Sequence, residues 1–496
     1  MTVRLPPSPS LEPLVFTSIA DASSVEGQLL AISNQVAPAA DLLPPPATAG
    51  SLFAAFPVWG GGGGFEVWGF LNNTVLVTTT SDFHTWGASL AVATAVPSLG
   101  IPKSCDRDDA AGVYLCLTFV SDAVGAVAFR CAAPLARNGC EPVGGTWKST
   151  AFYDHDDINL IFDASRARWV DVQVALVPAH VLNRTKPFCD NVQGDSMRVV
   201  TTRIAPAAAG GGGWGANSAC LGAQVSQYCP GPFNASAGAI FRPSASDPPE
   251  LQFYRLRPFV LGGGSARLVG HALIYAPSPL DLPASARCLG GVGAPGVCCH
   301  GPHIGDEFWI GPTSGDPADL AGWARPFAGA PRLMMPPGVY LMPQPQVLPG
   351  GAGGARHVFL DTATGTPGAA VWTLPLHRLA GLRAAANAAF TTAPFALPAA
   401  GLALNADAAW PESAGQPGDE ERGGYVMAEL LDAVTGAPFP GLPRNASALI
   451  NATGVALPLA WPGAPGPMPP PGTSVRLRFY LRAATVYAVY ARGAGS

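Results

Sequence analysis

The sequence has 496 residues, a formal net charge of −5, 48% hydrophobic residues and 12% charged residues. This length exceeds one ordinary core, so we expect at least two domains, and the apolar content predicts a globular chain rather than a disordered one. The sequence contains no basic tract, which argues against a nucleic-acid-binding protein. No apolar run reaches the ~20 residues of a membrane helix, so we expect no transmembrane span.

The cysteines and glycosylation sequons favour the secretory route. The chain has 10 cysteines, and none of them forms a Cys-x-x-Cys pair, so we expect disulfides formed in an oxidising compartment. Asn-x-Ser/Thr sequons begin at Asn72, Asn183, Asn234, Asn445 and Asn451. Residues Met1–Ser10 lack a charged and an apolar signal region. A removed signal, a truncated gene model and a non-secreted protein are all compatible with that start.

Short apolar segments dominate the chain from its beginning. They are rich in Val, Phe, Tyr and Thr, and Gly, Pro or Asp bounds most of them, which predicts many short strands. The expected strands are Phe65–Phe70, Thr74–Thr79, Gly112–Val120, Ala126–Arg130, Asn159–Phe162, Trp169–Val174, Arg198–Ile204, Leu268–Tyr275, Phe308–Gly311 and His357–Leu360. Glycine-rich and proline-rich insertions such as Gly60–Gly64 and Pro462–Pro471 read as surface loops.

Polar turns followed by tryptophan recur along this part of the chain. Ser81–Trp86, Gly144–Trp147 and Gly315–Trp323 are such segments, and they favour a propeller over a barrel or a sandwich. The alternative reading of each is a solvated hairpin with a tryptophan packed beneath it. The sequence shows a weak helical period only at Leu376–Ala389, where we also expect a domain boundary.

Beyond that boundary the strands alternate between apolar and polar residues. Between Val475 and Arg482, apolar residues take every second position and arginine or tyrosine the others, which predicts a strand with one buried and one wet face. We therefore expect an all-β protein with a propeller over residues 1–380 and a C-terminal β-sandwich over residues 381–496.

Several segments resemble one known family. Phe152–Asp163 with Trp169 and Val170, Asp247–Phe259, Glu307–Pro326 and the tail around Val475–Phe479 are similar to proteins related to the N-terminal domain of glycosyl hydrolase family 32, the invertase and fructosidase family. The match covers roughly residues 150–490. It implies a five-bladed β-propeller followed by a β-sandwich, and a glycoside hydrolase that acts on extracellular oligo- or polysaccharide.

Glycoside hydrolysis needs two carboxyl groups, one protonated as acid and one ionised as base or nucleophile. Asp156 is the first candidate, because the resemblance places it where the family has an Asp that stabilises the sugar cation. His155, Asp157 and Asn159 beside it are candidate substrate contacts. A solvated turn or a calcium loop built from these carboxylates is the alternative.

Glu250 and Glu307 are the other candidate catalytic carboxylates. Glu250 loosely resembles the acid of the family, and Arg255 nearby could hold the acid or a sugar hydroxyl. Glu307 is an alternate acid, with His303 as a candidate substrate contact. For both glutamates the alternative reading is an ion pair with arginine.

We expect no cofactor and no metal. Cys298–His303 offers cysteine and histidine ligands at a spacing that cannot enclose one ion, and the glycine run has no phosphate-loop ending. The expected partner is a carbohydrate substrate. The first-blade signature of the family, Trp-Met-Asn-Asp-Pro-Asn-Gly, is absent from residues 1–100. A propeller that binds glycans without cleaving them, or a structural module of a cell covering, therefore stays open.

Overall fold

The computed structural model is built from strands. It describes residues 14–16, 21–34, 36–61, 63–94, 102–121, 125–143, 158–184, 196–209, 213–215, 218–219, 238–244, 247, 251–261, 267–276, 303–326, 345–351, 354–361, 370–408, 424–462, 464 and 467–492. Within these ranges the only helices are 3₁₀ turns, namely η2 (Ala47–Ala49), η4 (Ala179–Leu182), η5 (Ala207–Ala209), η6 (Leu320–Gly322) and η8 (Arg444–Ala446). No helix in the described ranges is long and apolar enough to cross a membrane.

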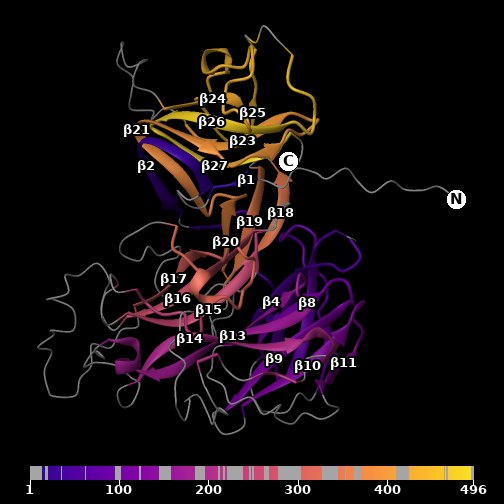
Figure 1. Cartoon of the computed structure of the whole chain (residues 1–496). Helices are drawn as coiled ribbons and strands as arrows, with labels where there is room; N and C mark the ends of the chain where they lie inside the picture. The colour runs from indigo at the N-terminus through magenta and orange to yellow at the C-terminus, as the bar shows by residue number, and fades with distance from the viewer. Residues whose placement is uncertain are drawn as a thin grey trace, which may run out of the picture.

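Five small antiparallel sheets form the blades of a β-propeller, as predicted (Figure 1). Blade I has β4 (Ser51–Pro57), β5 (Phe65–Leu71), β6 (Thr74–Thr80) and β7 (Leu90–Ala93). Blade II has β8 (Pro102–Asp108), β9 (Val113–Ser121), β10 (Gly125–Ala132) and β11 (Cys140–Pro142). Blade III has β12 (Ile158–Asp163), β13 (Arg168–Pro178) and β14 (Ser196–Pro206). Blade IV has β15 (Gln252–Val260), β16 (Leu268–Ala276) and β17 (His303–Ile310).

Blade V closes the ring with a strand from the start of the chain. It contains β18 (Gln346–Gly351), β19 (Gly354–Leu360) and β20 (Val371–Pro375), and its outermost strand is β3 (Ala37–Pro38). β3 pairs with β20 at Ala37–Thr373 and Pro38–Trp372. The first and last parts of the propeller are therefore joined by backbone hydrogen bonds.

The remaining strands form one nine-stranded sheet around a common apolar core. Its members are β1 (Leu14–Val15), β2 (Ala22–Ser33), β21 (Ala380–Thr392), β22 (Phe395–Ala396), β23 (Leu402–Asp407), β24 (Tyr425–Asp432), β25 (Thr453–Leu459), β26 (Ser474–Arg482) and β27 (Ala484–Ala491). The first half of β21 pairs with β27 and its second half pairs with β26. β21 therefore connects the part of the sheet around β27 to the part around β26, and the core lies between them. We call this part the sandwich unit.

Two features of this unit differ from expectation. The segment with the weak helical period is a strand, since β21 pairs along most of its length with β2. Its alanines favour a helix locally, but pairing partners on both edges outweigh that propensity. The N-terminal strands β1 and β2 belong to this sheet rather than to the propeller. The division into residues 1–380 and 381–496 as separate folding units stays a prediction.

The cysteine prediction is confirmed in part. Cys105–Cys116 joins β8 to β9, and Cys131–Cys140 joins β10 to β11, so both disulfides lie within blade II. The other cysteines lie outside the described residues. A disulfide restricts the unfolded chain and typically stabilises a fold by about 2–4 kcal/mol, so blade II is reinforced on both sides of its central ladder.

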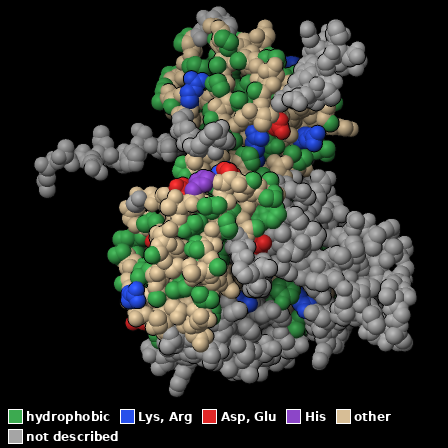
Figure 2. Space-filling model, turned by 180° about the vertical axis from the view of Figure 1, so that it is seen from behind, with side chains coloured by type: hydrophobic (Ala, Val, Ile, Leu, Met, Phe, Trp, Pro, Cys, Tyr) green, Lys and Arg blue, Asp and Glu red, His purple; other side chains and the backbone are tan. Residues whose placement is uncertain are grey.

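A polar cluster lies beneath the interface between the propeller and the sandwich unit. Asn405 of β23 donates to the carbonyl of Leu376 (2.6 Å) and to the hydroxyl of Tyr490 (2.9 Å), and accepts from Arg378 Nε (2.8 Å). Nearby, the buried ring of His357 in β19 accepts from the backbone N–H of His377 (3.2 Å). An apolar cluster that includes Phe359, Trp372 and Tyr490 surrounds these groups. Figure 2 shows acidic, basic and histidine side chains at the surface where the two units meet.

Asn405 is the centre of this cluster. Substitution of Asn405 by alanine tests how much the cluster contributes to stability. Asn405→Ala leaves the buried Arg378 Nε and the Leu376 carbonyl without their partner, so we expect a loss of about 2–4 kcal/mol in unfolding free energy. Asn451→Ala, at an exposed position, is the matched control and should change it by less than about 0.5 kcal/mol. Urea unfolding of both variants measures the difference, and equal midpoints would contradict this account.

His357 predicts a pH dependence of stability. Burial and the neighbouring His377 lower the pKa of His357 from 6.5 to about 3. Between these values the unfolded chain binds a proton that the folded chain does not, so stability is full above pH 6.5 and falls as pH decreases toward 3. The slope reaches about 1.4 kcal/mol per pH unit.

His357→Gln should remove this contribution. We expect wild type to lose more unfolding free energy than the variant as the pH decreases from 7 to 6, 5 and 4. The difference between the two proteins should therefore become smaller at each step. Two parallel pH profiles would show that His357 does not titrate as described.

Candidate functional site

The first strand of each blade lies at the inner edge of the ring, and polar side chains join these strands. Ser104 Oγ in β8 accepts from the backbone N–H of Leu160 in β12 (2.9 Å), and Asp106 Oδ2 accepts from the N–H of Phe162 (2.6 Å). In a propeller the blades are separate sheets, so no ladder satisfies these inner backbone groups. Side chains supply the missing partners.

Similar contacts hold the other inner strands. Gln346 Nε2 of β18 donates to the carbonyl of Ala55 in β4 (2.8 Å), and Arg107 Nη1 of β8 donates to the carbonyl of Pro57 (2.7 Å). Gln346 is 4% exposed. These contacts place polar groups from several blades at the inner edge of the ring.

Blades III and IV meet at a buried hydrogen bond. Arg257 Nε of β15 donates to Asn159 Oδ1 of β12 (2.8 Å), and Asn159 Nδ2 donates to the carbonyl of Val172 (3.4 Å). Both side chains are buried, Asn159 at 1% and Arg257 at 6% exposure. The contact fixes the start of β12 against the middle of β15. At its own start, β15 contacts β14, since Gln252 Oε1 accepts from the N–H of Arg198 (2.8 Å).

A buried ionic cluster continues from this point across blade IV. Asp306 of β17 contacts His271 Nδ1 of β16 (3.0 Å) and Arg255 Nη2 of β15 (3.5 Å). Burial raises the pKa of Asp306, but His271 and the arginine lower it well below its usual range overall. Burial lowers the pKa of His271, partly offset by Asp306. At neutral pH the Asp306 carboxylate is therefore ionised.

Glu307 points to the opposite face of β17. Its carboxylate accepts from Arg325 Nε (2.8 Å) and from Trp309 Nε1 (3.1 Å), and it is fully buried. Arg325 also bonds Asp247 (2.6 Å) and stacks 4.7 Å from the ring centre of Trp309. β17 is the third strand of its blade, away from the inner edge. The ion pair that the sequence offered as the alternative is present, and catalysis by Glu307 stays a prediction.

The other predicted site residues differ in how far the structure describes them. Asn159 and Arg255 lie in the described inner strands β12 and β15, close to the contact between blades III and IV. His303 begins β17, but its side chain is not among those described. The remaining ones, His155, Asp156, Asp157 and Glu250, lie outside the described residues. Their roles stay predictions.

Sequence reasoning missed Asp171, which lies in the middle strand of blade III. It is fully buried, and burial raises its pKa to about 7, although Arg203 opposes the shift. Asp171 stands in the pattern Trp169-Val170-Asp171-Val172, where a charge interrupts a strand that is otherwise apolar. That interruption is the signal that could have identified it.

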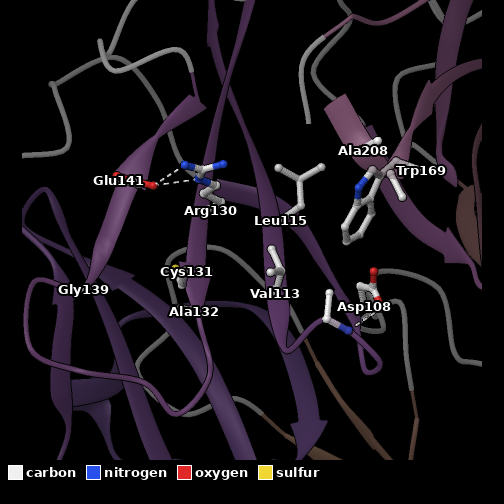
Figure 3. Close-up of a pocket in the computed structure, with 12 residues that line it drawn as sticks. Asp108, Val113, Leu115, Arg130, Cys131, Ala132, Gly139, Glu141, Trp169 and Ala208 are labelled. Carbon is white, nitrogen blue, oxygen red and sulfur yellow. Dashed lines mark hydrogen bonds and ion pairs between the residues drawn. The ribbon is translucent and has the colours of Figure 1, made fainter. Parts of the chain in front are cut away.

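A pocket of about 450 Å³ lies between blades II and III (Figure 3). Its volume is in the range of small-ligand sites. Trp169, Val113 and Leu115 form apolar walls, while Arg130 and Glu141 pair across β10 and β11 (2.7 Å). Asp108 lies at the end of β8, and its Oδ1 accepts hydrogen bonds from the backbone N–H groups of Ala110 and Ala111 in the following turn. No sequence motif had indicated this pocket.

Metal ligands do not gather in the part of the chain that the structure describes. No group of at least three His, Cys, Asp or Glu residues there is placed to hold an ion. The segment Cys298–Pro302 of the Cys/His motif lies outside that part.

Comparison with known proteins finds similarity only among solved structures. No family model and no curated protein matches the sequence. An endo-arabinase from Bacteroides thetaiotaomicron is 11% identical, with 67% of this chain and 98% of that chain covered and a TM-score of 0.34. An α-L-arabinanase from Penicillium chrysogenum, solved with arabinobiose, is 9% identical, with 70% and 99% covered and a TM-score of 0.34. A protein of unknown function from Dyadobacter fermentans is 9% identical, with 68% and 98% covered and a TM-score of 0.32.

These neighbours include glycoside hydrolases, but similarity at this level carries no argument about activity. The five-bladed fold is established by the strand pairing itself. The specific resemblance to glycosyl hydrolase family 32 stays a prediction.

The two glutamate–arginine pairs described above provide a matched test of burial. Glu307→Gln leaves the guanidinium of Arg325, which is 9% exposed, without one of its two carboxylates, so we expect a loss of about 3–5 kcal/mol in stability. Glu141→Gln breaks a pair whose side chains are 50% and 61% exposed, and should cost less than about 1 kcal/mol. Urea unfolding followed by tryptophan fluorescence measures both, and equal losses would contradict the described environments.

Proposed function

We propose that this protein is a glycoside hydrolase that acts on an extracellular oligo- or polysaccharide, with Asp156 and Glu250 as its working carboxylates. The contact between Arg257 and Asn159 supports this most strongly, because it joins β12 to β15. These are the inner strands that follow Asp156 and Glu250 in the chain. Carboxylates from neighbouring blades are the arrangement that glycoside hydrolysis needs.

Chain length limits how far Asp156 can be from this contact. Asp156 precedes Asn159 by three residues, which span at most about 11 Å between Cα atoms. Asp157 is one residue closer. Glu250 precedes Gln252 by two residues, a span of at most about 7 Å. The proposal therefore requires the carboxylate of Glu250 to approach from the side where β15 contacts β14.

The charges near the contact suit a division of roles. In the proposed division of roles Asp156 is the ionised base or nucleophile. Glu250 would then donate the proton to the leaving oxygen. His155, Asp157, Asn159, Arg255 and His303 are the proposed substrate contacts. The two disulfides of blade II fit the proposed secretion of the protein.

A glycan-binding propeller without hydrolysis is the second candidate. The inner strand of blade I, Ser51–Pro57, contains no Asp or Glu, and the nearest preceding acid is Asp41. The resemblance implies that the family's nucleophile belongs to this blade. Its absence from β4 favours binding over cleavage.

Substitution of the two proposed carboxylates tests the main proposal. Asp156→Asn and Glu250→Gln should each lower kcat/KM on a panel of aryl glycosides and soluble polysaccharides by about 10²-fold or more. Asp407→Asn, at an exposed position of the sandwich unit, is the control and should leave turnover unchanged.

The outcomes separate the two candidates. Unchanged turnover in both variants rejects the site assignment. A wild-type protein that cleaves nothing but binds sugars on a glycan array supports the second candidate instead. A protein that neither cleaves nor binds rejects both.

A further inference from the structure

The outer face of the sandwich unit carries a set of arginines. In β26 the side chains alternate, so that Val475, Leu477, Phe479 and Leu481 enter the core while the residues between them face outward. The outward residues are Arg476, Arg478, Tyr480 and Arg482, all half-buried. Register with β24 places Tyr425 opposite Arg482 and Glu429 opposite Arg478. We call this surface, together with Arg444 and Glu26 beside it, the arginine face.

Aromatic and charged contacts hold the arginine face in one arrangement. Arg444 lies 4.5 Å from the ring centre of Tyr480 and donates to the hydroxyl of Tyr425 (3.2 Å). Arg478 lies 5.4 Å from the same ring centre and pairs with Glu26 of β2. Tyr480 donates to Glu429 (2.9 Å). The guanidinium groups of Arg444 and Arg478 are therefore held in place before any ligand binds, which lowers the entropy lost on binding.

The face has an excess of positive charge. Four arginines share it with two glutamates, whereas the whole chain has a net charge of −5. Arg476 donates to the carbonyls of Ala433 and Thr392. Because these acceptors are neutral, they do not cancel the charge of the guanidinium. Arg482 makes no ion pair within the described ranges. The local field therefore attracts anions, although the protein as a whole is acidic.

We propose that the arginine face binds an acidic polysaccharide through its carboxylate or sulfate groups. The planar guanidinium forms paired hydrogen bonds with such groups. Arg476 and Arg478 are two residues apart on one strand, so their side chains repeat at about 6.7 Å along the strand. A row of cations along a strand fits an extended polyanion better than a small ion. The choice of a polysaccharide among polyanions rests on the proposed carbohydrate function.

A binding experiment with the full chain tests this proposal. Dextran sulfate and polygalacturonate are the probes, and neutral dextran is the uncharged control, with affinity measured by calorimetry. Arg444→Gln/Arg482→Gln should weaken binding of a charged probe by at least about tenfold, since it removes two charge-assisted contacts. Arg137→Gln/Arg242→Gln, which removes two exposed arginines of the propeller, is the charge-matched control and should bind as wild type does.

Salt and probe chemistry sharpen the result. Binding should weaken as salt rises, and the slope should be shallower in the Arg444/Arg482 variant. If the Arg444/Arg482 variant binds both dextran sulfate and polygalacturonate more weakly than wild type does, recognition by the guanidinium groups is supported. Equal binding of neutral dextran, or equal weakening in both double variants, overturns the proposal.

Further outcomes identify a different occupant. Tighter binding of single-stranded RNA or of phosphatidylserine vesicles than of either polysaccharide overturns the assignment to a polysaccharide. Asp156→Asn should leave this binding unchanged, so a failure of the proposed hydrolysis and a failure of the arginine face give different results.

Discussion

Side-chain hydrogen bonds between the inner strands are the constraint on which the propeller depends. Each blade satisfies its own backbone by antiparallel pairing, but its inner edge faces the next blade without a ladder. Ser104, Asp106 and Gln346 supply acceptors or donors to backbone groups of the neighbouring strand. A buried backbone group without a partner would cost about 1–3 kcal/mol. The residue types at the axis are therefore limited by the fold before any ligand is considered.

The same requirement applies to the buried polar groups of blades III and IV. Asn159 and Arg257 join the two inner strands, and Asp306 with His271 extends the network through blade IV. Ionic groups are tolerated there because each carries a partner within hydrogen-bond distance. Under the proposed function, the residues that precede these strands decide whether the site binds or cleaves a ligand. The proposed carboxylates occupy those sequence positions.

The sandwich unit holds the two ends of the chain together. β2 pairs with β21, and β1 pairs with β27, so strands from the beginning of the sequence complete a sheet made from its end. β3 then closes blade V. The apolar cluster under Phe359, Trp372 and Tyr490 joins the sheet to blades IV and V. On the other side of the sandwich unit, the outward side chains of β26 are partly exposed to solvent.

The sequence by itself determined the features that depend on neighbouring residues. Alternation between Val475 and Arg482 predicted a strand and its wet face, because side chains in a strand point to opposite sides with period two. The turn at Ser81–Trp86 could be predicted as well, since Asp82 accepts from the N–H groups of His84 and Thr85 within the same turn.

Only the tertiary structure decided the features that join distant residues. Leu376–Ala389 has a weak helical period, yet Ala380–Thr392 is a strand because β2 pairs along it from about 350 residues away in the sequence. Asn159 and Arg257 are 98 residues apart, and the ion pair that occupies Glu307 depends on Arg325 beyond its own strand. The pattern of apolar and polar residues within one segment cannot predict contacts between segments that are far apart in the sequence. They exist because blade packing brings buried polar groups together and each of them needs a partner.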